Sequence, residues 1–415
     1  MRSLNTFNDI VPKDINNICL KLWDNGIKAT VVGGIVRDFF NGSDKLNDWD
    51  FEIRFIDPSQ VDLEHRIQEI FPEIQSLGFG VFRYNLSENV QLEFSLPRTE
   101  DFNILIDQIH DHPLSHKDVE IQLDHRFSYL ESFARRDLTI NAIGIEFNKD
   151  KWTLVDPFFG LKDLEERISK NCSDNFSFDP VRYLRAIRFE ILFDLKRSVQ
   201  LDDLMKKMNL ALTTDHYLLY ESMKAGFFPF MKKLFNSIDH HKVSFPESWE
   251  ELRFLQKIDL PKTFLIADQI LLHSVFKTKL NLSDLGKLER FLKLRRGRAK
   301  HYLIGKELFN KIVAIDWDQK VMELTKLSWS QKINHQDFIE YVEYHKHFDS
   351  WTIEEEQGLI IQFDEHKIFQ LWRSYFPRAL EGKELFEKNQ SKENVEPNQR
   401  TPVSYTHLTL PTTPY

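Results

Sequence analysis

The sequence predicts an α+β protein, in which a mixed or antiparallel sheet with helices comes first and helices alone follow. Two observations lead to this class. Short apolar runs with alternating polarity, separated by Gly, Asn and Asp, occupy roughly residues 12–157. From about residue 161, apolar residues recur instead at three- and four-residue spacing, and strand patterns become rare.

The expected elements can be placed in chain order. An amphipathic helix over 14–27 comes first, and a second helix begins near Ile35, after Gly33-Gly34. The strands expected in this part are 28–32, 48–55, 81–84, 90–96, 138–146 and 151–155. The helices expected after it are 179–194, 201–211, 215–236, 249–257, 263–277, 283–294, 299–314 and 352–374.

Composition excludes several classes of protein. A chain of 415 residues is too long for one ordinary core, so about two to four modules are expected. Cys19 and Cys172 are far apart, with no Cys or His at metal-ligand spacing, which argues against a zinc site or a disulfide framework. We find no apolar core of a signal peptide and no run of about 18 apolar residues, so a cytoplasmic protein without a membrane span is expected.

The net charge is −9 at pH 7. A protein that grips nucleic-acid phosphates over a wide surface is usually basic. Any such surface must therefore be a local patch, and the densest basic run contains Lys287, Arg290, Lys293, Arg295, Arg296, Arg298 and Lys300. Runs of this kind are also typical of a plain solvated face.

Gly33-Gly34 separates a predicted strand from a predicted helix. Glycine lets the backbone approach a phosphate closely, and the helix N-terminus offers free N–H groups. Arg37, one turn into the helix, can reach the same phosphates. A plain turn before a helix gives the same pattern.

Asp48 and Asp50 alternate with Trp49 and Phe51 along a predicted strand. Residues i and i+2 of a strand share a face, so the two carboxylates project together while the aromatic rings face a core. Two carboxylates this close repel each other unless a cation lies between them, and hard oxygen ligands suit Mg²⁺. A lone Asp-x-Asp is more often an exposed strand edge or a turn.

Glu93 is the candidate for a third carboxylate. It lies between Leu92 and Phe94 on another predicted strand, opposite the apolar face. Two-metal phosphoryl transfer uses such an acid beside the metal that activates the attacking hydroxyl. By itself, Glu93 also fits a solvated strand position.

Arginines recur in two later segments. Arg135-Arg136 opens a segment that ends at Asn141-Ala142, and the planar guanidinium suits phosphate and sugar contacts. A helix end with solvated arginines gives the same pattern. Further on, one helix carries a stripe of three arginines after an N-cap candidate, namely Asp179, Arg182, Arg185 and Arg188. A solvated or salt-bridged face also fits this stripe.

In order and spacing, these segments resemble the class II nucleotidyltransferase family, which contains CCA-adding tRNA nucleotidyltransferases and bacterial poly(A) polymerases. The family pattern is Gly-Gly-x-Val-Arg-Asp, Asp-x-Asp, Arg-Arg-Asp-x-Thr-x-Asn-Ala, Asp-Pro-x-x-Gly-x-x-Asp-Leu and Glu-Asp-x-x-Arg-x-x-Arg-Ala-x-Arg-Phe. Residues 31–189 meet it almost completely, including the Asp-Pro segment over 156–164. The helical remainder is supported by size and texture only.

The resemblance implies a domain plan. Residues 12–157 would be the catalytic nucleotidyltransferase palm, and residues 158–236 a helical neck with the base-selecting helix. Residues 237–384 would be a helical body and tail that bind tRNA. Residues 385–415 lack a core and read as a disordered tail, and the abrupt change of composition at 401–415 also suits a non-native segment.

The resemblance also implies the reaction, which is template-independent addition of C, C and A to the 3′ end of tRNA from CTP and ATP, with release of pyrophosphate. Asp48 and Asp50 would bind two Mg²⁺ ions, and Glu93 would supply the third carboxylate. No protein partner is implied.

The nucleotide would then be held by the motifs already described. Gly33, Gly34 and Arg37 would meet the triphosphate, and Arg136 with Asn141 would hold phosphate or ribose. Asp179 would accept a hydrogen bond from the exocyclic amine of C or A, while Arg182 would donate to the atom beside it. Arg185 and Arg188 would reach phosphates or brace the helix.

Two departures from the family pattern stand out. The Glu that usually precedes the templating Asp is replaced by Phe178, which puts in doubt how firmly Arg182 is held. The segment between Glu93 and Arg135 is longer than in many relatives and matches a flexible loop of the family. It is rich in His and Asp, and we interpret it as a solvated loop rather than a metal site: His110, Asp111, His112, His116 and Asp118.

Other functions stay open at this point. Poly(A) polymerases generally carry a basic Gly-Arg/Lys-Arg/Lys-Phe segment before the third carboxylate, whereas this chain has Leu-Gly-Phe-Gly-Val-Phe over 77–82. That difference and the stretch over 92–100 favour the tRNA enzyme, although Phe178 leaves a CC-only or A-only enzyme open. The three carboxylates disfavour a non-catalytic RNA-binding protein of the same fold, and no His-Asp pair predicts a hydrolase.

Overall fold

The computed structural model describes residues 2–43, 46, 48–87, 90–102, 119–149, 151–258, 267–300, 302, 303 and 306. The chain divides into two compact units, Met1–Ala299 and Lys300–Tyr415. Several expected features lie outside the described residues: the His-rich segment over 110–118, most of the helix over 299–314, the helix over 352–374, and the tail over 385–415.

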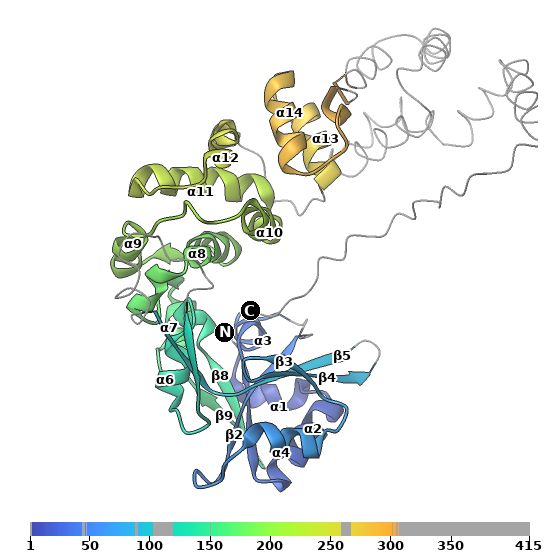
Figure 1. The fold of residues 1–415 in the computed structure, drawn as a ribbon, viewed down its shortest axis with the longest axis vertical. Helices are drawn as coiled ribbons and strands as arrows, with labels where there is room; N and C mark the ends of the chain where they lie inside the picture. The colour runs from blue at the N-terminus through green and yellow to red at the C-terminus, as the bar shows by residue number, and fades with distance from the viewer. Residues whose placement is uncertain are drawn as a thin grey trace, which may run out of the picture. The chain divides into compact units, whose positions relative to one another are not determined.

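A seven-stranded mixed sheet organises the N-terminal part of the first unit, in the order β3-β4-β5-β2-β1-β8-β9 (Figure 1). β2 and β5 pair in parallel, whereas the other neighbours pair antiparallel. The strands are Ile27–Val32 (β1), Trp49–Phe55 (β2), Gln75–Gly78 (β3), Val81–Ser87 (β4), Val90–Ser95 (β5), Gly144–Asn148 (β8) and Lys151–Val155 (β9). The predicted α+β class is confirmed.

One face of the sheet is apolar because β2 alternates as its sequence predicts. Trp49 and Phe51 are buried on this face, and the Phe7 ring contacts the rings of Trp49 and Phe39. Burying a side chain of this size contributes roughly 1.5–3 kcal/mol. The short helices of this part are Leu4–Thr6 (η1), Phe7–Ile10 (α1), Lys13–Asp24 (α2), Gly34–Phe40 (α3) and Leu63–Ile70 (α4).

The opposite face of β2 is polar and only partly covered. Glu52 and Arg54 are buried there, and the Arg54 guanidinium donates hydrogen bonds to Glu52 and to Ser132 of α6 (Tyr129–Ala134). Asp50, two residues earlier on the same face, is exposed. The helix therefore covers the second half of β2 and leaves its first residues open.

A two-stranded hairpin lies apart from the main sheet. It pairs β6 (Arg98–Asp101) with β7 (Glu120–Leu123) in antiparallel register, with Glu100 opposite Ile121.

The strand predicted over 138–146 is wrong in its first half. Only Gly144–Asn148 forms β8, whereas Thr139–Asn141 forms a 3₁₀ turn, η2. The reason is local hydrogen bonding, because the Asp137 carboxylate accepts from the Leu138 backbone N–H and from the Asn141 side chain. Side-chain bonds of this kind compete with the sheet ladder.

Helices make up most of the first unit from residue 160 onward. They are Gly160–Glu165 (α7), Asp174–Phe178 (η3), Pro180–Leu192 (α8), Val199–Met205 (α9), Asp215–Ala225 (α10), Phe227–His241 (α11), Glu247–Glu250 (α12), Arg253–Lys257 (η4), Ala267–Lys277 (α13) and Leu282–Phe291 (α14). The helix predicted over 215–236 is two helices broken at Gly226, and the helix predicted over 249–257 is α12 followed by η4. Two short parallel strands, β10 (Ile168–Ser169) and β11 (Lys196–Arg197), flank α8 in sequence.

Among the described helices, none combines the length and the apolar character that crossing a bilayer requires.

Candidate active site at the open end of strand β2

Asp50 and Glu93 occupy paired positions on the parallel strands β2 and β5. Asp48 is exposed just before β2 begins. Asp50 reaches solvent, yet many protein atoms surround its carboxyl group. This desolvation and the negative charges of Glu93 and Asp48 raise the pKa of Asp50 to about 7, although the positive charge of Arg136 opposes the shift. The structure therefore brings the first two predicted acids and Glu93 into one electrostatic group.

Glu93 has a cationic neighbour on β4. Arg83 lies opposite Glu93 in the antiparallel β4–β5 register, and the Arg83 Nη2 atom is 2.8 Å from Glu93 Oε1. Both side chains are partly exposed. Among the described residues, one group of three potential metal ligands has its ligand atoms within 4.8 Å of one another, and that group is Asp202, His240 and His241. The carboxylate oxygens of Asp48, Asp50 and Glu93 therefore do not all lie this close together.

Gly33 brings the backbone up to this acidic group. Its φ of 81° lies in the region that favours glycine, and a Cβ atom here would lie 3.5 Å from Arg136 Nη1 and 3.8 Å from Asp50 Oδ2. The next residue, Gly34, begins α3, and a Cβ atom there would lie 3.6 Å from Arg37 Nη2. The glycines, Asp50 and the two arginines therefore converge at the open end of β2.

Arg37 is buried, and two neighbouring side chains accept hydrogen bonds from it. Its Nη1 donates to Asn141 Oδ1 at 2.6 Å, and its Nε donates to Asp38 Oδ1 at 2.9 Å. The guanidinium lies over the rings of Phe189 and Phe193, 4.8 and 4.7 Å from their centroids. Burial lowers the pKa of Arg37, although Asp38 opposes this shift.

Arg136 is less completely engaged. Its Nη1 donates to the Asn141 carbonyl oxygen at 3.2 Å and its guanidinium lies over the Phe133 ring, but its buried Nε has no hydrogen-bond partner among the described residues. Burial, with the neighbouring charge of Arg135, lowers the pKa of Arg136 to about 10. A half-buried arginine with an unused Nε donor beside Asp50 is suited to an anionic ligand.

Asp137 connects these residues to α8. One of its oxygens accepts from Leu138 N and Asn141 Nδ2, and the other accepts from Arg185 Nε at 2.6 Å. Burial acts to raise the pKa of Asp137, but Arg185 and these hydrogen bonds outweigh it and hold that pKa well below its usual range. The sequence interpretation did not select Asp137, although its place after Arg135-Arg136 was the available signal.

Each arginine of the predicted stripe on α8 faces an acid. Arg185 pairs with Asp137, and Arg188 Nε lies 2.9 Å from Glu221 of α10, with both partners buried. Arg182 Nη2 lies 2.9 Å from Glu100 on β6. Asp179 accepts from the Val181 N–H at 2.9 Å and so caps α8, while its other oxygen lies 3.5 Å from Arg182 Nε.

The Asp-Pro segment over 156–164 packs against η2, the turn that carries Asn141. Asp156 accepts hydrogen bonds from the backbone N–H groups of Gly160 and Leu161 at the start of α7. A Cβ atom at Gly160 would lie 2.0 Å from the Thr139 carbonyl oxygen, so only glycine permits this contact. Asp163 then accepts from the Thr139 hydroxyl at 2.7 Å. The segment holds η2, and with it Asn141, in place.

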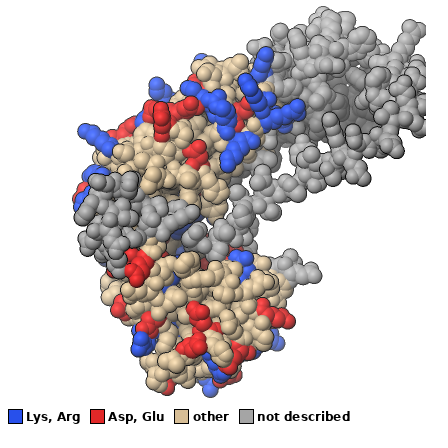
Figure 2. Space-filling view, in the orientation of Figure 1, with Lys and Arg blue, Asp and Glu red and all other residues tan. Residues whose placement is uncertain are grey.

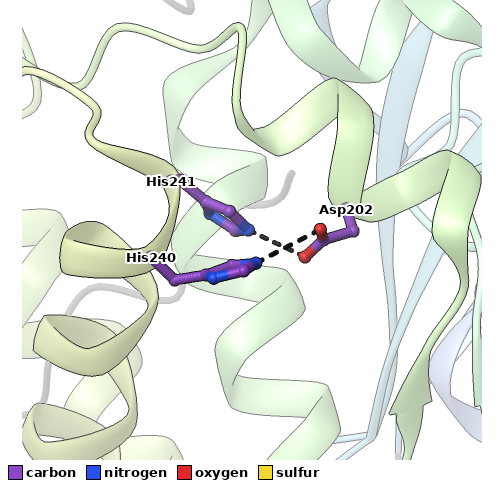
Figure 3. Close-up of side chains that lie close together, drawn as sticks. All are labelled: Asp202, His240 and His241. Atoms are coloured by element: carbon purple, nitrogen blue, oxygen red, sulfur yellow. Dashed lines mark hydrogen bonds and ion pairs between the residues drawn. The ribbon is translucent and has the colours of Figure 1, made fainter.

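A second cluster of possible metal ligands lies at the far side of α8. Figure 3 shows Asp202 facing both His240 and His241. The Arg197 Nη1 atom already lies 3.3 Å from Asp202 Oδ1 and 3.1 Å from His241 Nε2, and Lys206 Nζ lies 2.8 Å from Asp202 Oδ2. These side-chain cations occupy the approach that a metal would need, so the cluster is a structural network.

The basic run predicted for RNA is only partly available. Arg290 pairs with Glu251 at 2.9 Å and Lys287 with Asp284 at 3.3 Å. Beyond α14, the exposed or half-buried members are Lys293, Arg295, Arg296 and Arg298, with Lys300 exposed after them. Figure 2 shows Lys and Arg side chains gathered over the region of α13 and α14.

The N-terminal part is similar in sequence to known proteins. Residues 29–169 match the poly A polymerase head domain family. The multifunctional CCA protein of Xylella fastidiosa is 34% identical over 167 residues, which cover 39% of this chain and 34% of that protein. The A-adding tRNA nucleotidyltransferase of Aquifex aeolicus is 31% identical over 196 residues, covering 45% of this chain and 21% of the relative. The match therefore spans about a third or less of each relative's length.

Solved structures resemble a larger share of the chain. The CCA-adding enzyme of Bacillus stearothermophilus in complex with CTP aligns with a TM-score of 0.52 and 16% identity, covering 91% of this chain and all 100% of that one. Another complex of a CCA-adding enzyme with CTP aligns with a TM-score of 0.53 and 19% identity, covering 93% and 90%. At this identity the likeness establishes the fold.

Proposed function

We propose, on the premise that residues 29–169 belong to the poly A polymerase head domain family, that this protein adds C, C and A to the 3′ end of tRNA from CTP and ATP without a nucleic-acid template. The observation that carries the proposal is the convergence of Gly33, Asp50 and Arg136 at the open end of β2. The names of the Xylella and Aquifex relatives point to the same class of reaction.

The acids at this end suit Mg²⁺. Asp48, Asp50 and Glu93 offer hard carboxylate oxygens, and their adjacent negative charges repel one another without a cation. Asp48 and Asp50 would hold two ions, and Glu93 would join them on release from Arg83. When bound, the ions lower the pKa of the attacking 3′-hydroxyl and stabilise charge on the leaving pyrophosphate.

The residues around the acids bind and orient the nucleotide. The Gly33-Gly34 backbone and Arg136 take the triphosphate, since they border Asp50. Arg37 and Asn141, bonded to each other, carry the phosphate and ribose contacts beside them. Asp137 keeps Asn141 and Arg185 in register with this group.

Asp179 and Arg182 select the base. The Asp179 carboxylate accepts from the exocyclic amine of C or A, and Arg182 donates to the adjacent ring nitrogen or carbonyl. U and G present the opposite pattern on that edge, and each buried polar group left unpaired costs about 1–3 kcal/mol. Arg185 and Arg188 brace the helix through their ion pairs with Asp137 and Glu221.

The proposal is tested by incubating the full chain with tRNA that ends at the discriminator base, Mg²⁺, and the four NTPs singly and together. Sequenced products ending in C, C, A support it. A long A tail indicates a poly(A) polymerase, and no extension overturns the enzymatic reading in favour of an RNA-binding protein. Addition of A alone or of C-C alone indicates an A-only or CC-only enzyme. This outcome is included because one relative is an A-adding enzyme and because Phe178 replaces the usual Glu.

The exposed basic residues after α14 serve as the tRNA phosphate contact in this proposal, in a protein that works in the cytoplasm. The double substitution Arg295→Glu/Arg296→Glu should weaken tRNA binding about 10-fold at 0.1 M salt and flatten the dependence of affinity on salt. Lys207→Glu reverses an exposed charge after α9 and serves as the control. Equal loss in both variants would argue against a local patch.

A further inference from the structure

We infer that Glu100 positions Arg182 for base selection, taking the part of the Glu that the family usually carries where this chain has Phe178. The inference rests on the proposed function and names the residue that sets its specificity. In the usual arrangement the acid lies four residues before the arginine. Here it comes from β6, 82 residues away in sequence.

Arg182 is held on three sides. Its Nη2 donates to Glu100 Oε2 at 2.9 Å, its Nη1 donates to the Asn175 carbonyl oxygen at 3.3 Å, and its Nε lies 3.5 Å from Asp179 Oδ2. The arginine and glutamate side chains are only 8% and 12% exposed. The guanidinium is planar, so the acceptors that bind it set its orientation. The Glu100 carboxylate therefore fixes the plane in which Arg182 presents its remaining N–H donors.

Glu100 is itself firmly placed. Its second oxygen, Oε1, lies 3.6 Å from Arg98 Nη2 and 3.8 Å from Arg135 Nη1. Its backbone carbonyl oxygen accepts from Asn175 Nδ2 at 3.2 Å, so η3 is bonded to β6 directly before α8 begins. Three arginines and a backbone bond therefore restrict the carboxylate to one orientation.

Phe178, which replaces the usual acid, packs against a residue close to Glu100 in the chain. Its ring packs against Phe102, two residues after Glu100, with the centroids 5.5 Å apart. Phe178, which stands where the family usually has the acid, thus contacts the residue that directly follows β6, the strand that carries Glu100. Phe102 also lies beneath Arg182, whose guanidinium carbon is 5.9 Å from the ring centroid.

The test compares nucleotide selection in Glu100→Gln with that of the wild-type full chain. The amide keeps the size of the side chain but cannot hold the guanidinium as an ion pair. We expect kcat/KM for CTP and for ATP to fall about 10-fold, with little change for UTP and GTP, so that the CTP:UTP ratio falls about 10-fold. Because each ratio is measured on one preparation, partial unfolding of the variant does not alter it.

Rescue and a matched control separate positioning from a general structural role. Phe178→Glu introduced into the Glu100→Gln protein returns an acid to the helix and should restore much of the CTP:UTP ratio. Glu120→Gln makes the same change at an exposed position of the same hairpin and should leave the ratio unchanged. A wild-type ratio in Glu100→Gln, or no recovery in the double variant, overturns the inference. A wild-type protein that extends no tRNA overturns the proposed function instead.

Discussion

The two charged regions of this protein are built in opposite ways. At the open end of β2, Asp48, Asp50 and Glu93 lie near one another. Arg83 pairs with Glu93, and the charge of Arg136 acts on Asp50, although no ion pair joins those two side chains in the described part of the chain. Along α8, each arginine of the stripe has an acid within 2.9 Å, and the three acids come from β6, from α10 and from the segment between α6 and η2. The region at β2 therefore groups charges of the same sign, whereas each arginine of the stripe on α8 forms an ion pair with an acid.

On the proposed function, the first region binds a ligand, whereas the ion pairs of the second hold helices and strands together. Like charges held close together destabilise the folded protein, and such groups are typical of sites that bind a ligand of opposite charge. A buried ion pair adds little net stability, but removing one partner leaves an uncompensated charge and is costly. Substitutions in the two regions should therefore affect activity and stability in opposite proportions.

The largest effect is expected from Asp50→Ala. Losing one metal-binding carboxylate should lower the rate of CMP and AMP addition by about 10³-fold or more. The melting temperature should stay equal to that of the wild type or rise, because a repelling charge is removed. The rate is measured by tRNA extension and the melting temperature by circular dichroism.

Asp9→Ala is the matched control for that substitution, since Asp9 is an exposed acid on α1. It should change neither the rate nor the melting temperature. Near-normal activity in Asp50→Ala would show that the acids at β2 are not the metal site.

Asp137→Ala probes the balanced region. Removing this carboxylate leaves Arg185 largely buried without its partner and deprives Leu138 and Asn141 of an acceptor. The free energy of unfolding should fall by about 3–5 kcal/mol, measured by urea denaturation. Adding Arg185→Met should cost less than the sum of the two single changes, because the stranded charge is gone. Strict additivity would mean that the pair does not act as a unit.

The sequence predicted those features whose cause is local. Trp49 and Phe51 alternate with Asp50 because each face of a strand has one environment, and the structure buries both rings and exposes Asp50. The match of residues 29–169 to the poly A polymerase head domain family was also predictable, since the motifs there are short runs of adjacent residues. The roles given to single site residues stay predictions until they are tested.

Features that depend on distant pairing were beyond the sequence. The alignment of Asp50 with Glu93 results from parallel pairing of two strands about forty residues apart, which no local pattern specifies. In the sequence, Phe178 suggested that Arg182 had lost its acidic partner. In the fold, Glu100 of the β6–β7 hairpin contacts Arg182 instead, and Phe178 packs against Phe102. The 3₁₀ turn at Thr139–Asn141 replaced a predicted strand because Asp137 bonds its own neighbours.

The smallest effect is expected from His241, which contacts Tyr183 of α8 and Asp202 of α9. His241 is buried, with Nδ1 2.8 Å from the Tyr183 hydroxyl and Nε2 2.8 Å from Asp202 Oδ1, and with Arg197 and the exposed His240 beside it. Burial lowers the pKa of His241 from its ordinary value of 6.5, and the charge of Arg197 adds to this, although Asp202 opposes it. The neutral imidazole satisfies both neighbours by accepting from Tyr183 and donating to Asp202.

The sign of the pH dependence follows from that lowered pKa. Below pH 6.5 the unfolded chain binds a proton at this histidine that the folded chain does not, so the folded state loses stability as the pH falls through 6.5 and gains nothing further above it. Thermal melting between pH 7.5 and 5.5 should show this decline in the wild type and a flatter profile in His241→Gln. His240→Gln changes the exposed neighbour and should retain the wild-type decline. A decline of equal steepness in all three proteins would place the titrating group elsewhere and leave His241 as a packing residue.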